Sequence, residues 1–376
     1  MTGRRIRITQ DAALSGALAA DTLLPTPVGM TALSDIAPGA TVFGAEGDQV
    51  PVLRVSEIHE RPCFQVEFST GDRIVADAEQ EWYTETRDPS RASIGPRRRT
   101  TAELAELPTA SLAVRVAPAA HIATKRLPVA PYLLGAWLAI GTETSASVAL
   151  RGARREVIRQ LRAQGVGIFA STSDDLHWLG LSGDQPRRNG HLGNQLAQLG
   201  VVAERHLPMT YLRAGDDQRR ELLAGLLESS AEVSDGGEVV LRALNPALGA
   251  GVHQLLASLG YRPWLRYRSP EETAVGFVTS ERAFADEALH HQHQRRRRLF
   301  PDVRPRRLVV AVHPVAARPV RRIQVGAEDG ILLVGPAFVP MPGAATRSTV
   351  VDALKPVSGR PLLPPRVTAA GRTTTR

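Results

Sequence analysis

Three groups of residues could carry chemistry, judged by their types and spacing. Cys63 is the only cysteine, which excludes disulfides within the chain and cysteine-based zinc sites, and we expect a buried thiol in a strand. His290, His291 and His293 precede four arginines; they could bind metal or nucleic acid, but we favour a solvated linker face. The Gly-Ala-Gly stretch 249–251 lacks the third glycine and the preceding strand of a dinucleotide fingerprint, so we expect it to start a helix.

Composition favours a polyanionic partner but leaves an alternative open. The 376 residues carry a formal net charge of +8, and the sequence pI is about 10.4, which favours binding to nucleic acid. Lysine occurs only at Lys125 and Lys355, so nearly all the basic charge is arginine, as a GC-rich genome produces without selection for binding. Double-stranded DNA is therefore one expected partner, and arginines that are merely compositional are the alternative.

Neither a secretory leader nor a membrane span is visible in the sequence. Residues 1–7 include three arginines, but no uninterrupted apolar core follows them. The longest apolar runs are far shorter than a bilayer requires. A single cysteine fits a reducing compartment. We therefore expect a cytoplasmic protein without membrane contact, built from two or three domains.

Strand patterns occupy both ends of the chain. Between residues 21 and 83, alternating or apolar runs separated by turn signals predict strands at 42–43, 50–55, 63–68 and 73–76. The same pattern returns near the C-terminal end, at 307–312, 320–325 and 331–334. The polar stretch 87–101, with two prolines and three consecutive arginines, predicts an exposed loop. Residues 346–376, rich in Pro, Thr, Arg and Gly, predict disorder.

The middle of the chain, from about residue 131, has a helical period. Within 151–165, Val157, Ile158 and Leu161 fall on one face, and further helices are predicted at 218–227 and 248–259. Short strand-like runs lie between them, at 238–241 and 275–278. A Leu-Gly motif recurs about ninety residues apart, at 133–141 (LLGAWLAIG) and 223–231 (LAGLLESSA). This order of helix, strands, helix, strands indicates a two-fold internal repeat.

The two nonapeptides resemble the signature helix of LAGLIDADG homing endonucleases, also called DOD-type. In that family the eighth residue is an aspartate that holds a catalytic divalent metal, whereas Ile140 and Ser230 stand at this place here. The small residues of both motifs imply close packing of the two helices. Glu228, the nearest acid, lies some 200° around the helix from Ser230 at about 100° per residue. The resemblance therefore implies the fold without its metal, and magnesium is needed only if endonuclease activity survives.

A β module split by an α/β insertion is the layout of an intein, and five sequence blocks resemble intein blocks in order. The resemblance is strongest to inteins of replicative helicases that carry a LAGLIDADG insertion, and it covers about 17–344. Residues without the required chemistry hold the catalytic places: Ala17 stands for the first nucleophile, Gln80 for the activating histidine, Arg322 for a subclass cysteine, and Pro342 and Gly343 for the terminal histidine and asparagine.

The resemblance implies an α+β fold in which an all-β Hint module is split by an insertion with two pseudo-symmetric halves. We expect an N-terminal flank at 1–16, the N-terminal Hint part at 17–128, the endonuclease-like domain at 129–294, the C-terminal Hint part at 295–345, and a disordered tail at 346–376. Splicing needs a nucleophile, an imidazole and a cyclising asparagine. Cleavage of DNA needs two metal-binding carboxylates. We therefore predict that both activities are lost.

Two functional classes remain beside residual endonuclease or peptide cleavage. The insertion could bind DNA through arginines of its sheet regions, with steep loss of affinity in salt; the candidates are Arg151, Arg154, Arg155, Arg242, Arg266 and Arg268. Alternatively, the same fold serves as a protein-interaction or structural module without nucleic-acid affinity. No resident cofactor or metal is expected in either case.

Overall fold

The computed structural model describes residues 16–86, 94–108, 111–144, 147–170, 175–181, 191–298 and 306–344. The chain divides into two compact units. Unit 1 consists of Met1–His121, Leu256–Trp264 and Arg304–Val357, and unit 2 of Ile122–Leu255, Leu265–Val303 and Ser358–Arg376. The flank 1–15 and the tail 346–376, for which disorder was predicted, lie outside the described residues.

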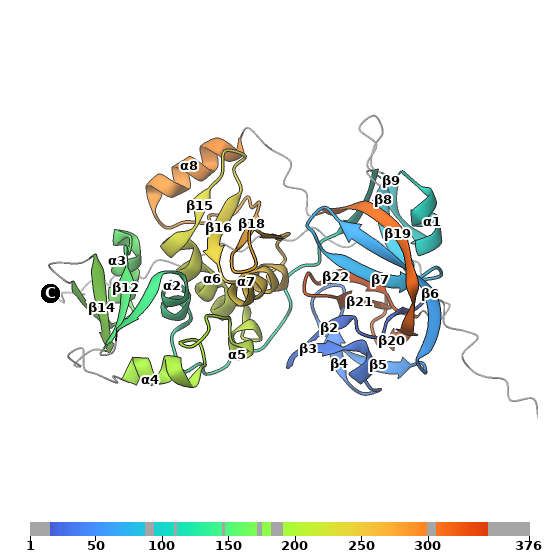
Figure 1. The fold of residues 1–376 in the computed structure, drawn as a ribbon, viewed down its shortest axis with the longest axis horizontal. Helices are drawn as coiled ribbons and strands as arrows, with labels where there is room; N and C mark the ends of the chain where they lie inside the picture. The colour runs from blue at the N-terminus through green and yellow to red at the C-terminus, as the bar shows by residue number, and fades with distance from the viewer. Residues whose placement is uncertain are drawn as a thin grey trace, which may run out of the picture. The chain divides into compact units, whose positions relative to one another are not determined.

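Unit 1 is built around a seven-stranded sheet of order β1-β7-β6-β19-β10-β8-β9 (Figure 1). Its strands are β1 (Leu18–Ala19), β6 (His59–Phe68), β7 (Arg73–Asp77), β8 (Glu81–Thr86), β9 (Ile94–Thr100), β10 (Leu112–Arg115) and β19 (Arg306–Arg321). Smaller sheets join β2 (Leu23–Thr26) with β3 (Gly29–Ala32), β4 (Thr41–Phe43) with β5 (Gln49–Val55) and β20 (Ile323–Val325), and β21 (Ile331–Val334) with β22 (Val339–Pro342).

The C-terminal part of the chain completes the N-terminal β module. The long strand β19 pairs antiparallel with β6 along most of its length and also with β1 and β10. One apolar core contains side chains from both parts, among them Val66, Trp82, Val309 and Leu332. All seven predicted strand segments lie within or overlap observed strands. The strands of unit 1 therefore form one β module and come from two separated stretches of sequence.

The prediction of a loop at 87–101 is wrong for its second half. Residues Ile94–Thr100 form β9, which pairs with β8 at the end of the main sheet, and Thr101–Glu106 form helix α1. Pro96 is compatible with this position because an edge strand leaves some N–H groups unpaired. Arg98 lies over the Tyr83 ring at 5.1 Å and pairs with Glu81 at 3.0 Å. These cross-strand contacts stabilise a strand whose polar composition had predicted a loop.

Two successive segments, which lie mostly in unit 2, have the same order of elements. The first has α2 (Pro131–Ile140), β11 (Gly141–Thr144), β12 (Ser147–Arg151), α3 (Arg155–Ala163), β13 (Val166–Ala170) and β14 (Leu176–Leu181). The second has α6 (Asp216–Ser230), β15 (Glu232–Val233), β16 (Val239–Leu244), α7 (Pro246–Ser258), β17 (Trp264–Tyr267) and β18 (Thr273–Phe277). The sheet orders, β11-β12-β14-β13 and β15-β16-β18-β17, also correspond. Helices α4 (His191–Gln198), α5 (Met209–Leu212) and α8 (Glu287–Arg297) complete the unit.

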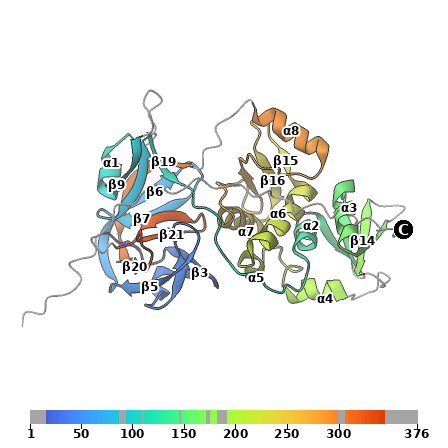
Figure 2. The same cartoon turned by 180° about the vertical axis from the view of Figure 1, so that it is seen from behind.

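Helices α2 and α6, which contain the two Leu-Gly motifs, lie side by side in both views (Figures 1 and 2). A Cβ atom at Gly135 would lie 2.2 Å from the carbonyl oxygen of Leu222, and one at Gly225 would lie 2.1 Å from that of Tyr132. Only glycine permits this backbone approach. The close packing predicted from the small residues is therefore confirmed for both glycines.

Two further predictions have definite outcomes in unit 2. The predicted helix face of α3 is confirmed, because Val157, Ile158 and Leu161 are its buried residues. The stretch 249–251 does not start a helix: α7 begins at Pro246, and Asn245 Oδ1 accepts from the N–H of Leu248 at 2.7 Å. Its glycines lie inside α7, where a Cβ at Gly249 would lie 2.1 Å from Thr273 Oγ1. Tight packing explains them.

The histidine cluster is not a solvated linker. It lies on α8, where His293 is 2% exposed and packs edge-on against Phe284 with ring centroids 6.3 Å apart. Burial lowers the pKa of His293 to about 4. His290 is half-buried and His291 is exposed. In the described part of the chain, no helix is both long and apolar enough to span a membrane.

Candidate functional site

The strand pairing of unit 1 fixes the position of Ala17 beside the end of β7. Residue Leu18 of β1 pairs with Ala76 on one side and with Arg321 on the other. The N–H of Ala17 donates to Asp77 Oδ1 at 2.9 Å, and its carbonyl oxygen accepts from the N–H of Asp77 at 2.9 Å. The peptide bond before Ala17, the position where an intein begins its chemistry, is therefore held by defined contacts.

Gln80 connects this peptide bond with the other end of the module. A Cβ on Gly16 would lie 2.5 Å from Gln80 Cα, so the two backbones are in close contact. The side-chain amide Nε2 of Gln80 donates to the carbonyl oxygen of Pro342 at 2.9 Å and is buried. The next residue, Gly343, donates its N–H to the Gly330 carbonyl at 2.8 Å. Positions separated by some 260 residues in sequence thus meet around one glutamine.

Arg322 lies on another side of Ala17. Both residues line a cavity of about 80 Å³ together with Ser56, His59, Arg61 and Val320. The guanidinium of Arg322 lies 3.8 Å from Glu79, and Arg61 pairs with Glu79 at 3.3 Å and with Asp77 at 3.1 Å. The two arginines in the cavity wall are therefore paired with carboxylates. No cysteine is among these lining residues.

Cys63 is a buried thiol, as expected from the sequence. It is 1% exposed and packs in a small apolar cluster with Ala17 and Val320. Burial raises the pKa of the thiol, and Sγ donates to the carbonyl oxygen of Arg61 at 3.3 Å. A neutral thiol that is engaged in this way is a poor nucleophile.

Ala17, Gln80 and Gly343 can hold the nearby peptide bonds in place, but their side chains offer little chemistry that would break one. Ala17 has a methyl group where a nucleophile is needed, and Gly343 has no amide that could cyclise. The amide of Gln80 does not protonate near neutral pH, so it donates a hydrogen bond but cannot transfer a proton to a leaving nitrogen. Ala17, Gln80 and Gly343 therefore occupy this site without the side-chain groups that acid–base and covalent catalysis require.

The second candidate site lies at the C-terminal ends of α2 and α6. The eighth residues of the motifs, Ile140 and Ser230, are both partly exposed, and Ser230 Oγ bonds back to the Leu226 carbonyl at 3.5 Å. Magnesium prefers carboxylates and water as ligands, which neither side chain supplies. Among the residues that the structure describes, no group of three or more His, Cys, Asp or Glu is placed to hold a metal. The residues at these helix ends do not fit a divalent ion.

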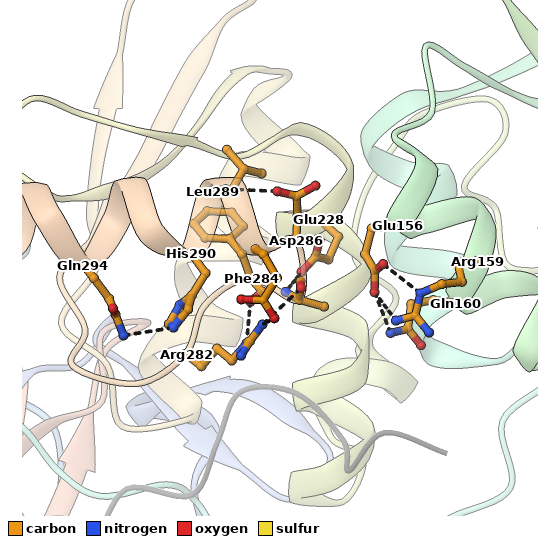
Figure 3. A network of polar contacts seen from close by, with 12 residues as sticks. Glu156, Arg159, Gln160, Glu228, Arg282, Phe284, Asp286, Leu289, His290 and Gln294 are labelled. Carbon is orange, nitrogen blue, oxygen red and sulfur yellow. Dashed lines mark hydrogen bonds and ion pairs between the residues drawn. The ribbon is translucent and has the colours of Figure 1, made fainter. Parts of the chain in front are cut away.

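Glu228 does not replace the missing acids. Its side chain is fully buried and turns toward the segment before α8, where Oε1 accepts the N–H of Ala285 (Figure 3). Burial raises its pKa to about 7, and the nearby carboxylates Glu156 and Asp286 act in the same direction. Its other oxygen, Oε2, is buried without a hydrogen-bond partner. Glu228 is therefore a carboxyl group in the core with only one of its two oxygens hydrogen-bonded.

The six arginines proposed for DNA binding differ in their surroundings. Arg151, Arg155, Arg266 and Arg268 are exposed. Arg242 pairs with Glu232 at 3.1 Å. The guanidinium of Arg154 donates to the backbone carbonyls of Glu228 and Ala231. Arg154 and Arg242 are therefore engaged with other groups of the protein.

Sequence reasoning missed two residues that the structure places at these sites. Asp77 accepts a hydrogen bond from the backbone N–H of Ala17. It lies close to Gln80 in the sequence but was not singled out. Arg205 binds the C-terminal carbonyls of α2 and lies over the Trp137 ring at 5.4 Å. Arg205 belongs to no motif, and an isolated arginine between two helices carries no sequence signal.

Comparison with known proteins places this geometry in context. No family model matches the chain. It is 35% identical over 354 residues to the replicative DNA helicase DnaB of Mycobacterium intracellulare, which covers 86% of this chain and 58% of the relative. The DnaB helicase of Mycobacterium leprae (strain TN) is 40% identical over 83 residues, 22% of this chain and 14% of the relative. The chain thus spans less than two thirds of the length of these relatives.

Solved structures of inteins also resemble the chain. The Msm DnaB1 intein splicing domain bound with zinc is 15% identical at a TM-score of 0.30, and the MchDnaB-1 intein is 16% identical at 0.28. Each match covers 87% of this chain and all of the other. The similarity to a replicative helicase DnaB supports the resemblance to inteins of replicative helicases. The chain is similar to inteins, and it has a mixed fold of α-helices and β-sheets.

Proposed function

We propose that this chain is a degenerate intein that has kept its scaffold and lost both chemistries. In this proposal unit 1 is a Hint module, unit 2 is a LAGLIDADG-type insertion, and neither protein splicing nor DNA cleavage occurs. One observation carries the proposal: Ala17, Gln80 and Gly343 come together as the catalytic residues of an intein must, yet none of them has the side chain that the chemistry needs.

The matching order of elements in the two segments of unit 2 supports the assignment of the insertion. Each segment begins with a Leu-Gly helix, and these two helices pack through glycines. The residues at the metal-binding places do not supply carboxylates. The same unit offers exposed arginines on two strand regions, and we propose that it retains affinity for double-stranded DNA.

A titration of labelled duplex DNA tests this affinity. We expect binding at about 50 mM salt that weakens by roughly tenfold or more at about 200 mM, since released counterions drive such association. The double variant Arg266→Gln/Arg268→Gln should weaken binding and flatten the salt dependence. The matched control is Arg54→Gln/Arg97→Gln, which changes two exposed arginines of unit 1, removes the same charge and should leave affinity unchanged.

A protein-interaction or structural module is the second candidate. It is favoured by Arg154 and Arg242, whose guanidinium groups already bind backbone carbonyls or a carboxylate of the protein itself. Absence of DNA binding even at low salt would support this candidate over the first. Magnesium is included in the same titration, because cut DNA would revive the endonuclease and contradict the proposal of inactivity.

Restoring the missing groups tests the retained scaffold of unit 1. In the variant Ala17→Cys/Gln80→His/Pro342→His/Gly343→Asn, a thiol and an imidazole return to the positions that converge around Gln80. We expect added thiol reagent to release residues 1–16 from this variant and not from the parent chain. A folded variant that remains intact would show that the convergence is not close enough for acyl transfer.

A further inference from the structure

Two arginines each donate hydrogen bonds to two backbone carbonyls at the C-terminal end of one of the paired helices, in the same pattern. Arg205 donates from Nη1 to the carbonyl oxygen of Leu138 at 3.3 Å, and from Nη2 to that of Gly141. Leu138 and Gly141 are the sixth and ninth residues of the first Leu-Gly motif. One guanidinium therefore spans the last turn of α2.

The second motif is bound at the same two places. Arg154 donates from Nη1 to the carbonyl oxygen of Glu228 at 2.9 Å, and from Nη2 to that of Ala231 at 3.0 Å. These are again the sixth and ninth residues of the motif. We call Arg154 and Arg205 the guanidinium clamps.

The clamps come from different places in the chain. Arg154 is the residue that precedes α3 in the first segment, yet it binds the helix of the second segment. Arg205 follows α4, outside both Leu-Gly motifs, and binds the helix of the first segment. The two contacts are equivalent in what they bind, although the arginines themselves do not correspond in sequence.

Electrostatics explains why a cation is favourable at these ends. The last carbonyls of a helix lack intrahelical partners, and the aligned peptide dipoles give the end about half a negative charge. Where two helices end together, the partial negative charge that must be neutralised is doubled. A guanidinium suits it because its planar fork can donate to two carbonyls at once. The eighth residue of each motif, Ile140 or Ser230, stands between the two clamped carbonyls along the chain.

We propose that the guanidinium clamps are internal cations that take the electrostatic place of the divalent metal at these helix ends. The inference rests on the proposed assignment of unit 2 to the LAGLIDADG type. It adds that the loss of the acids and the presence of the arginines go together: the helix ends are already neutralised. A carboxylate restored at position 140 or 230 would meet a guanidinium before it met a metal.

A purely structural role would make a different prediction. If the clamps only cap helices, removing them lowers stability and changes nothing else. If they stand in for a metal, removing them must also open the site to a cation once carboxylates are present. Metal binding is therefore the readout that separates the two roles.

The test compares four forms of the full chain with Mn²⁺ alone as the probe, followed by electron paramagnetic resonance. They are the parent, the acid pair Ile140→Asp/Ser230→Asp, the clamp pair Arg154→Gln/Arg205→Gln, and the four-fold combination. Glutamine keeps hydrogen-bond donors near the carbonyls and removes the charge. Thermal unfolding of each form is measured with and without Mn²⁺.

We expect only the four-fold combination to bind Mn²⁺ with an affinity about tenfold or more above that of the acid pair, since two fixed positive charges no longer oppose the ion. Bound Mn²⁺ should also raise its melting temperature. Equal affinity of the acid pair and the combination would overturn the proposal, and so would a folded combination that binds no Mn²⁺.

The combination could fail to fold, so half-site variants keep the proposal testable. Ser230→Asp/Arg154→Gln and Ile140→Asp/Arg205→Gln each open one helix end, and each should bind Mn²⁺ more tightly than its single aspartate variant. None of these titrations contains DNA. Cut DNA from the parent chain would therefore count against the proposed function, whereas the Mn²⁺ results count for or against the clamps.

Discussion

The glycine contact between α2 and α6 yields a prediction with a built-in opposite control. Gly225→Ala adds one methyl group at a place where the structure has no room for it. The new Cβ would lie 2.1 Å from the Tyr132 carbonyl oxygen and 2.9 Å from the backbone nitrogen of Ala136. These are backbone atoms, so no side chain can rotate away. Carbon–oxygen contacts in proteins rarely fall below about 3.3 Å. The helices must therefore move apart by about 1 Å.

The expected cost follows from two opposing effects. Overpacking of this kind costs about 3 kcal/mol, at the upper end of its usual range because rigid backbone must move. Alanine in place of glycine gains about 1 kcal/mol of helix propensity. The net loss should be about 2 kcal/mol. Gly193→Ala in α4 is the matched control, because its new Cβ would meet only Val148 Cγ2 at an ordinary 3.5 Å. It should stabilise the chain by up to about 1 kcal/mol.

Thermal unfolding and hydrogen exchange give the readout. A 2 kcal/mol loss corresponds to a fall of about 4–8 °C in melting temperature for a unit of this size. Because the chain has two units and need not unfold in one step, exchange at the amides of α2 and α6 should locate the effect in unit 2. If Gly225→Ala raised the melting temperature as Gly193→Ala does, the close approach of the helices would be refuted.

Three further predictions concern buried or capping groups. Burial raises the pKa of Glu228 from 4.5 to about 7, so its contribution is fully present below pH 4.5 and is lost as the pH rises to about 7; Glu228→Gln should make the chain more stable than the parent at about pH 8, by up to about 3 kcal/mol, with no difference near pH 4.5 in chemical denaturation. Burial lowers the pKa of His293 from 6.5 to about 4, so stability falls as the pH drops between those values; His293→Gln should remove this fall and the exposed control His291→Gln should keep it. Thr100 caps α1 in a capping box, and Thr100→Ala should cost about 1 kcal/mol in urea unfolding; an unchanged midpoint would argue against the cap.

Strands and amphipathic helices were predictable because their patterns are local. The alternation in 50–55 and the face of Val157, Ile158 and Leu161 depend only on neighbouring residues. The order of the intein-like blocks could also be followed in the sequence. The meeting of Gln80 with Pro342 was implied by the resemblance alone, because no local pattern encodes a contact across some 260 residues.

Other features were hidden because tertiary contacts outweigh local composition. Strand β9 has the composition of a loop, and its pairing with β8 and the stacking of Arg98 on Tyr83 determine its conformation. His293 is buried although its neighbours in the sequence are polar, because its side of α8 packs against Phe284. Arg154 looked like a surface cation, and only the structure shows which carbonyls it binds.

The most direct test of the central claim is the intact mass of the purified parent chain after prolonged incubation with and without a thiol reagent. The claim is that the ends of the β module are held in splicing geometry without splicing chemistry. It predicts a single species at the full mass of 40.5 kDa under both conditions. A fragment cut before Ala17 or after Gly343, or a shortened product in which the flanks are joined, would contradict it.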